Sequence, residues 1–247
     1  MYTLGPIIHN PQMVARLEQR GVRPISCASE GTPGIVVIRS HGVAPEVVEK
    51  VKAYGHRIVD ATCPFVRRAQ EDVQELRDEG YHIIIVGKRD HAEVEGLLGY
   101  ADKDVNVIWD VEDLESLRRL QRVGVVAQTT TPFDRFRMLV GGLLEKSRQL
   151  KIYNTICHST EERQTQTLEL AKRADVVIII GGRNSANTTR LAELCRDLGR
   201  TTYHVETADE VRPDWVKGAS LVGVSAGAST PDWIIDEVMH TLEGMAE

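Results

Sequence analysis

Two cysteines stand at matching places in the chain and could hold a metal. Cys63 ends the segment Asp-Ala-Thr-Cys, and Cys157 ends Asn-Thr-Ile-Cys. A polar residue lies 28 positions after each of them, His91 after Cys63 and Ser185 after Cys157. In a reducing compartment a thiolate acts as a metal ligand or nucleophile rather than in a disulfide. The equal spacing indicates that the two cysteines occupy equivalent positions of an internal repeat.

Loops that end in proline support this repeat. Residues 123–132 match residues 222–231 at an offset of 99, and residues 36–45 end on the same proline. Each segment has the pattern of a strand, a small polar loop and a proline at the start of a helix. The chain therefore contains three related units.

One cysteine in each unit would give three thiolates. His9 belongs to the loop of the first unit, so its partner cysteine would lie about 28 residues earlier, roughly 20 residues before Met1. Three thiolates on a common axis leave one iron of a cubane cluster without a protein ligand. Such an open iron acts as a Lewis acid and delivers electrons to a substrate.

The elements that position these loops alternate along the chain. Continuous apolar runs predict parallel strands covered on both faces, over residues 34–39, 82–87, 123–127, 175–181 and 221–225. Cap, proline and glycine signals predict helices over residues 11–19, 45–54, 64–79, 133–150, 159–173, 188–198 and 231–244. Ser159 and Glu162 have the spacing of a capping box. The pattern is typical of an α/β protein.

Composition excludes several classes of protein. The 247 residues carry a net charge of −6 and only 5% aromatic residues, which argues against a nucleic-acid groove. No apolar run approaches the ~20 residues of a membrane helix, and the first residues lack the features of a signal peptide. We therefore expect a cytoplasmic protein that binds neither nucleic acid nor membrane.

Seven motifs together carry a family resemblance. They are His9-Asn10, Ser40 to Val43, Asp60 to Pro64, His91 to Gly96, Gln128 to Thr130, Asn184 to Asn187 and Ala226 to Asp232. In this order, over nearly the whole chain, the sequence resembles the 4-hydroxy-3-methylbut-2-enyl diphosphate reductase family. The resemblance implies three pseudo-symmetric α/β units with parallel sheets, arranged as a cloverleaf around a central [4Fe-4S] cluster. We expect the units at residues 1–62, 63–156 and 157–247.

The resemblance also implies a reaction. Two electrons and two protons would remove the allylic hydroxyl group of 4-hydroxy-3-methylbut-2-enyl diphosphate as water. The products would be isopentenyl and dimethylallyl diphosphate, at the last step of the non-mevalonate isoprenoid pathway. The expected partners are this small allylic diphosphate and an electron donor such as ferredoxin or flavodoxin.

Site residues follow from the same resemblance. Cys63 and Cys157 would hold the [4Fe-4S] cluster. Glu93 would supply a proton, with Thr129 relaying or orienting it. The diphosphate would bind to His9, His41, His91, Ser185, Asn187 and Ser229. Gln128 and Thr130 are weaker candidates, and Glu95 is the nearest rival of Glu93.

The sequence departs from the family in two places. The family begins with a segment that carries the third thiolate and adds a strand to the third unit, and we expect that segment upstream of Met1. Met1 would then be a misplaced start. Ala186 stands where many relatives have a second serine.

Two other functions remain open. The chain could be a cluster-poor relic that binds diphosphates without turnover. A mononuclear metal hydrolase could use His9, His41, His91 and Glu93, but no His-x-x-x-His pair places two ligands on one element. The two remaining cysteines, Cys27 and Cys195, are interpreted as structural.

Overall fold

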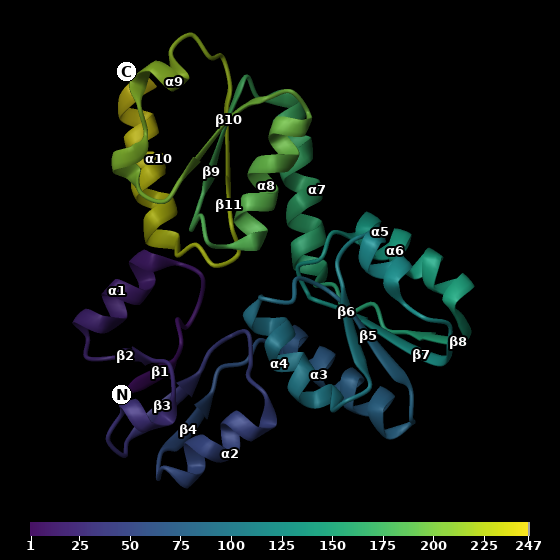
Figure 1. Cartoon of the computed structure of the whole chain (residues 1–247). Helices are drawn as coiled ribbons and strands as arrows, with labels where there is room; N and C mark the ends of the chain where they lie inside the picture. Colours follow the sequence, from purple (N-terminus) through teal and green to yellow (C-terminus); the bar gives the residue numbers. More distant parts are fainter. Residues whose placement is uncertain (247) are drawn as a thin grey trace. The chain divides into compact units, whose positions relative to one another are not determined.

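The strands form three separate parallel sheets in a computed structural model that describes residues 1–246 (Figure 1). Sheet A has the order β2-β1-β3-β4, sheet B the order β6-β5-β7-β8 and sheet C the order β10-β9-β11. The strands are β1 (Tyr2–Leu4), β2 (Arg23–Ile25), β3 (Ile35–Ile38), β4 (Arg57–Asp60), β5 (His82–Val86), β6 (Val105–Ile108), β7 (Leu120–Ala127), β8 (Ser147–Ile152), β9 (Val176–Ile180), β10 (Thr201–Val205) and β11 (Val222–Ala226). The predicted α/β class with parallel sheets is confirmed.

Helices alternate with these strands. They are α1 (Pro11–Gln19), α2 (Pro45–Ala53), α3 (Pro64–Asp78), α4 (Ala92–Ala101), α5 (Val111–Ser116), α6 (Phe133–Lys146), α7 (His158–Arg173), α8 (Ala186–Asp197), α9 (Pro213–Val216) and α10 (Asp232–Ala246). Short 3₁₀ turns lie at Ala28–Glu30 and Ala208–Glu210. Among residues 1–246, no helix has the length and apolar character needed to cross a membrane.

Two local predictions are wrong. The helix predicted over 133–150 ends at Lys146, and the next residues form β8, which pairs with β7. No glycine or proline separates these two elements, so the change from helical to alternating periodicity is the only signal. Ser159 does not cap α7 through a capping box, because the helix already begins at His158 and places Ser159 in its first turn.

The same connection geometry recurs in all three sheets. Gly5, Gly87 and Gly181 follow β1, β5 and β9, and each donates its backbone N–H to the last residue of the neighbouring strand. Thr131 and Thr230, which follow β7 and β11, also match. Their hydroxyls donate to the carbonyl oxygens of the last residues of the neighbouring strands β5 and β9. The internal repeat read from the sequence is therefore present in the backbone.

The chain divides into two compact units. Unit 1 contains residues 1–7 and 17–157, and unit 2 contains residues 8–16 and 158–247. Sheets A and B lie in unit 1, and sheet C lies in unit 2. The finer division at residues 62 and 156 stays a prediction.

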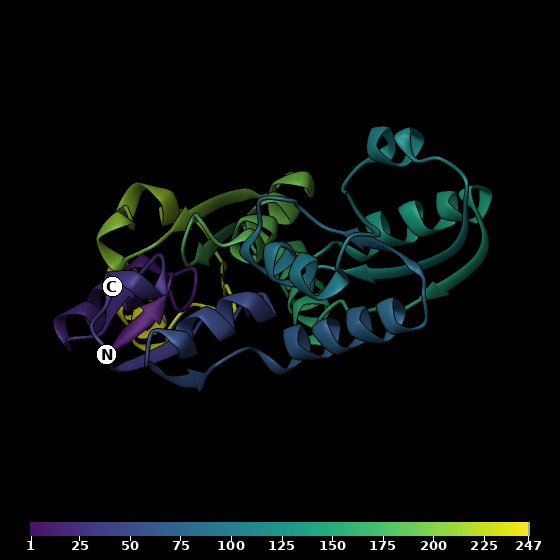
Figure 2. The same ribbon diagram turned by 60° about the horizontal axis from the view of Figure 1, so that its bottom comes forward.

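Sheet B is covered on both faces. Ile83 and Ile85 point to the side of α3 and α4, whereas Ile84 and Val86 pack with α5 and α6. Figure 2 shows α3 and α6 on opposite sides of the sheet. All four side chains are fully buried, which explains why β5 is a continuous apolar run rather than an alternating one.

Sheets A and C have smaller cores: sheet A is buried mainly on one face, as the alternating burial of β3 shows, whereas sheet C is buried on both. In sheet A, Val36 and Ile38 pack with Val51 of α2. In sheet C, one face packs on Ile234 of α10 and the other on a cluster of α7 and α8 that contains Cys195. Cys195 is fully buried, so its interpretation as a core residue is confirmed.

Replacing Leu76 with alanine should destabilise unit 1 strongly. Leu76 of α3 is fully buried and lies so close to β7 that a Cβ on Gly124 would be 2.5 Å from its Cδ2 atom. Because the resulting cavity cannot collapse easily, we expect Leu76→Ala to lower the free energy of unfolding by ~2–5 kcal/mol. Leu144→Ala is the matched control, since Leu144 is 65% exposed. Equal denaturant midpoints for the two variants would contradict this packing.

Candidate functional site

Five predicted site residues lie just beyond the carboxyl ends of strands in unit 1. His41 follows β3, Cys63 follows β4, His91 follows β5, Thr129 follows β7 and Cys157 follows β8. In a parallel sheet these ends meet at one edge, where ligands of α/β proteins usually bind. Each sheet of unit 1 therefore presents its candidate residues at a single edge.

Both cysteines are anchored in the same way. The backbone N–H of Cys63 donates to the carbonyl oxygen of Ser40 at 2.9 Å, and that of Cys157 donates to Thr129, also at 2.9 Å. Ser40 and Thr129 belong to the loops after β3 and β7, the strands beside β4 and β8. The two thiols are free and partly buried. Their equivalence, predicted from spacing, is confirmed in the backbone.

Each cysteine also lies at the start of a helix. Cys63 is the N-cap residue of α3, and Cys157 immediately precedes α7. The positive end of a helix dipole favours a thiolate, which is the form that binds metal. These features fit two ligands of an iron-sulfur cluster.

The other two cysteines do not share these features. Cys27 is exposed in the 3₁₀ turn region of sheet A, where its sulfur lies 3.1 Å from the hydroxyl of Ser29. Cys195 is buried in an apolar cluster. The third ligand predicted upstream of Met1 lies outside the described residues and stays a prediction.

Glu93 and Thr129 form the most completely buried polar contact of the site. One carboxylate oxygen of Glu93 accepts the backbone N–H of Thr129 at 2.6 Å, and the other accepts the Thr129 hydroxyl at 2.8 Å. Glu93 is 2% exposed and Thr129 is 6% exposed. Thr129 also accepts the N–H of Cys157, so the carboxyl group is connected to a candidate cluster ligand through one residue.

Burial sets the protonation state of Glu93. Removal from water raises the pKa of its carboxyl group to about 7, and the two hydrogen bonds from Thr129 partly oppose this change. Near neutral pH the group therefore exists in both protonated and ionised forms, as a general acid requires. Glu95, the alternative acid, is exposed on the same helix.

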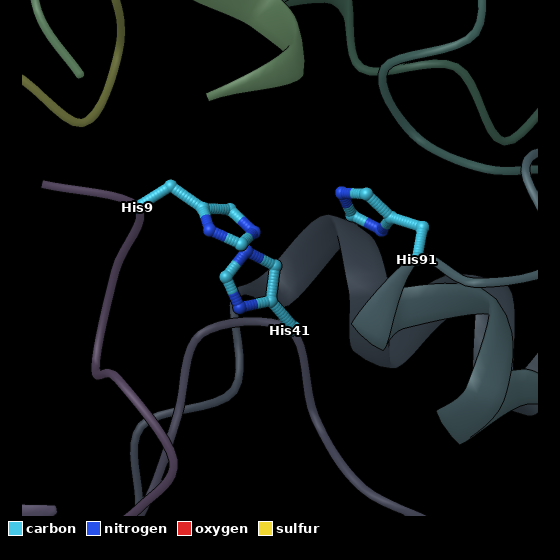
Figure 3. Close-up of side chains that lie close together, drawn as sticks. All are labelled: His9, His41 and His91. Atoms are coloured by element: carbon cyan, nitrogen blue, oxygen red, sulfur yellow. The ribbon is translucent and has the colours of Figure 1, made fainter. Parts of the chain in front are cut away.

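His41 and His91 meet within unit 1. Their ring centroids are 5.6 Å apart, with the planes at 79° (Figure 3). Nδ1 of His91 caps α4 by accepting the backbone N–H of Glu93 at 3.2 Å. A neutral His91 ring therefore carries its proton on Nε2, where it is suited to donate to a phosphate oxygen.

Ser185 and Asn187 hold the corresponding positions in unit 2. Ser185 is the N-cap of α8, as His91 is the N-cap of α4, and Asn187 is two residues further on, as Glu93 is. Asn187 is 7% exposed, and among residues 1–246 neither polar atom of its amide has a hydrogen-bond partner. A buried amide without partners is costly, so this position favours a polar ligand.

His9 and Ser229 are neighbours in unit 2. The Ser229 hydroxyl donates to the carbonyl oxygen of His9 at 3.4 Å. A Cβ on Gly182 would lie 2.6 Å from the same carbonyl oxygen, so only glycine allows this approach. The loop that leads to Ser185 thus packs directly against the backbone of His9.

Arg183 fixes the position of the loop that leads to Ser185, and the sequence analysis did not predict this role. Its guanidinium pairs with Glu206 and Glu210, while its backbone N–H donates to Glu206 at 2.7 Å. The ring of His204 also lies 2.9 Å from the carbonyl oxygen of Gly181. No sequence motif joins these residues, because the contacts bridge the loop to β10 and the turn that follows it.

Gln128 and Thr130 contact each other rather than Glu93. The Gln128 amide donates to the Thr130 hydroxyl at 2.7 Å, and its oxygen accepts the N–H of Lys88 at 3.1 Å. These bonds tie the loop after β7 to the loop after β5. The two residues therefore support the positions of Thr129 and His91.

The buried acid should make stability depend on pH. Between pH 4.5 and about 7 the folded chain keeps a proton on Glu93 that the unfolded chain has released. Raising the pH through this window should therefore destabilise the wild type relative to Glu93→Gln, by roughly 3 kcal/mol in total. Urea unfolding of both proteins at a series of pH values measures the difference. A difference that is constant over this window would contradict a raised pKa.

The chain is similar to known proteins over nearly its whole length. The family model described as LytB protein matches residues 1–243. The 4-hydroxy-3-methylbut-2-enyl diphosphate reductase of Geobacter metallireducens is 47% identical over 241 residues, which cover 98% of this chain and 86% of the relative. The enzyme of the same name from Citrifermentans bemidjiense is 49% identical and covers 99% and 87%.

Solved structures give the same result. The structure of (E)-4-hydroxy-3-methyl-but-2-enyl diphosphate reductase, the terminal enzyme of the non-mevalonate pathway, is 45% identical with a TM-score of 0.75, covering 99% of this chain and 88% of its own. The E-1-hydroxy-2-methyl-but-2-enyl-4-diphosphate reductase from Plasmodium falciparum is 25% identical with a TM-score of 0.92, covering 98% and 78%. The family model and these relatives extend over nearly the whole chain, which therefore belongs to the LytB family.

Proposed function

We propose that the chain reduces 4-hydroxy-3-methylbut-2-enyl diphosphate to isopentenyl and dimethylallyl diphosphate. The curated relatives carry the name of this reductase, and the related structure is titled as the terminal enzyme of the non-mevalonate pathway. Two electrons and two protons are consumed, the allylic C–O bond breaks, and the oxygen leaves as water. The electrons would come from a carrier such as ferredoxin or flavodoxin.

The buried pair of Glu93 and Thr129 is the observation that carries this proposal. An acid that protonates a departing hydroxyl group must hold a proton at neutral pH and lie within hydrogen-bond reach of its relay. The pKa of Glu93 near 7 and its 2.8 Å contact with the Thr129 hydroxyl meet both needs. Glu93 would protonate the leaving oxygen, and Thr129 would orient the carboxyl group or pass the proton.

The diphosphate would be held by neutral donors. The residues proposed to donate to it are His9, His41, His91, Ser185, Asn187 and Ser229. The unsatisfied amide of Asn187 supports a ligand at this position. Imidazoles, hydroxyls and amides near helix starts bind a diphosphate without a large positive charge, which suits a chain with a net charge of −6.

Cys63 and Cys157 would hold the [4Fe-4S] cluster. When bound, the cluster would pass on the electrons of the carrier one at a time and would offer a Lewis-acidic iron for the hydroxyl group. The contact from Cys157 to Thr129, and from Thr129 to Glu93, would keep the proton donor at a fixed position relative to that ligand.

Glu93→Gln tests the proton donor. Glutamine keeps the shape of the side chain but cannot donate an acidic proton, so we expect turnover to fall by ~10²–10⁴-fold while substrate affinity changes little. Glu95→Gln is the matched control, because it makes the same change two residues away on the same helix. The assay uses anaerobic, cluster-reconstituted protein with a chemical reductant, and calorimetry measures substrate binding. Normal turnover of Glu93→Gln, or equal losses in both variants, would remove Glu93 from the reaction.

The residues proposed to bind the diphosphate support a second function that needs no cluster. The buried amide of Asn187 favours a polar ligand whether or not iron is bound. The second candidate is therefore a protein that binds allylic diphosphates without turnover.

Iron content distinguishes the two candidates. For a reductase, the reconstituted wild type should contain about four irons per chain. Cys63→Ser should lose most of them, and Cys27→Ser should keep them. Diphosphate binding by an iron-free wild type that resists reconstitution would instead support the second candidate.

A further inference from the structure

A separate cavity opens at the edge of sheet A in unit 1. Its volume is about 410 Å³, and its lining includes Leu4, Ser26, Arg39, Val43, Val47 and Glu95. The walls come from the carboxyl ends of β1 and β3, the start of α2 and the first turns of α4. This volume is within the range of small-molecule sites.

The position of the cavity in the sheet is the usual one for a ligand. In sheet A, the chain leaves β1 toward β2 on one side, and it leaves β3 toward β4 on the other. The crevice between the ends of β1 and β3 is therefore the topological switch point, where open α/β sheets bind ligands. The residues assigned above to the reductase site do not line this cavity.

Arg39 brings a positive charge into the cavity that Glu95, another residue of the lining, balances only in part. Burial lowers the pKa of its guanidinium, and Glu95 is the charge that opposes this change. Glu95 itself is exposed, and within residues 1–246 the buried Nε of Arg39 has no hydrogen-bond partner. A half-buried cation normally has a counter-charge or a full set of hydrogen bonds.

Comparison with sheet B shows what is unusual about Arg39. The backbone carbonyl oxygen of Arg39 accepts the N–H of Gly42, just as that of Gln128 accepts the N–H of Thr131. The two residues therefore occupy equivalent positions in their sheets. In sheet B, the side chain of Gln128 fills the corresponding crevice, because its oxygen accepts the backbone N–H of Lys88, the residue after Gly87.

The corresponding bond is impossible in sheet A. The residue after Gly5 is Pro6, which has no backbone N–H. The guanidinium of Arg39 could not accept such a bond in any case, because it has only donors. Gly5 has a φ of +72°, and a Cβ there would lie 2.7 Å from Nη1 of Arg39. The backbone thus leaves room for the guanidinium, and the crevice stays open beside it.

We propose that this cavity binds a small organic anion, with its phosphate or carboxylate head on Arg39 and its short apolar body against Leu4, Val43 and Val47. Ser26 lines the same cavity, and its hydroxyl would add a hydrogen bond to the head. Glu95, in the first turn of α4, also lines the cavity, and its exposed carboxylate is the charge with which the anion would share Arg39. The proposal does not depend on the reductase activity or on a cluster.

Backbone amide NMR of the 247-residue chain tests the site. The probes are butyl phosphate, pentanoate and inorganic phosphate, each titrated into the wild type. We expect saturable shifts at Leu4, Ser26 and Val47 with the two organic anions, and weaker binding of inorganic phosphate, which has no apolar body. The tighter of the two organic probes identifies the preferred head group.

Variants separate a specific site from general charge effects. Arg39→Met should weaken binding at these residues by about tenfold or more, because a charge-assisted hydrogen bond is lost, and Arg39→Lys should retain part of the affinity. Arg57→Met is the matched control, since it removes the same charge from an exposed position in β4 of the same sheet.

Three results would overturn the proposal. They are an absence of shifts at Leu4, Ser26 and Val47, unchanged affinity in a folded Arg39→Met, and equal weakening by Arg57→Met. Shifts at Ser185 and Asn187 report on the separate diphosphate site. Any shifts that the phosphate probes cause at Ser185 and Asn187 should be the same in Arg39→Met. Loss of binding in the cavity of sheet A is therefore distinguishable from loss of binding at the diphosphate site.

Discussion

The site depends on the parallel pairing of β5, β7 and β8. This pairing brings Glu93 and Thr129, which are 36 positions apart, into a double hydrogen bond, and it places Cys157, which follows β8, within hydrogen-bond distance of Thr129. Ile83 to Val86 are buried on both faces of the sheet, so the register cannot slip without exposing them. The carboxyl group of Glu93 is therefore held in a buried position beside a packed core, and burial there raises its pKa.

Much of the fold was predictable because the signals are local. Continuous apolar runs identified β5, β7, β9 and β11, and proline or glycine marked most helix ends. The short strand β2 and the strand β8 were harder, because they are brief or half exposed and their pairing comes from neighbours distant in the sequence. Matching glycines and threonines in the loops show why the repeat was visible: equivalent backbone bonds require similar residues at equal spacing.

The site was predictable only in part. Glu93 drew attention through its motif with His91, yet neither its burial nor its contact with Thr129 can be read from a sequence, since both depend on the loop after β7. Arg183 and Arg39 carry no local signal at all. Arg183 is notable because it pairs with two glutamates that follow β10, Glu206 and Glu210. Arg39 is notable because the residue after Gly5 is a proline. Charges of this kind acquire a role only from what the fold places beside them.

The protonation state of Glu93 is the central claim, and ¹³C NMR of its side-chain carboxyl group measures it most directly. The resonance is assigned by its absence from a Glu93→Gln spectrum and followed from pH 3 to pH 9. A titration midpoint near pH 7 would agree with a buried acid that still holds a proton under physiological conditions. A midpoint near the ordinary value of 4.5 would mean that the carboxyl group is solvated and ionised, and that the proton for the reaction comes from elsewhere.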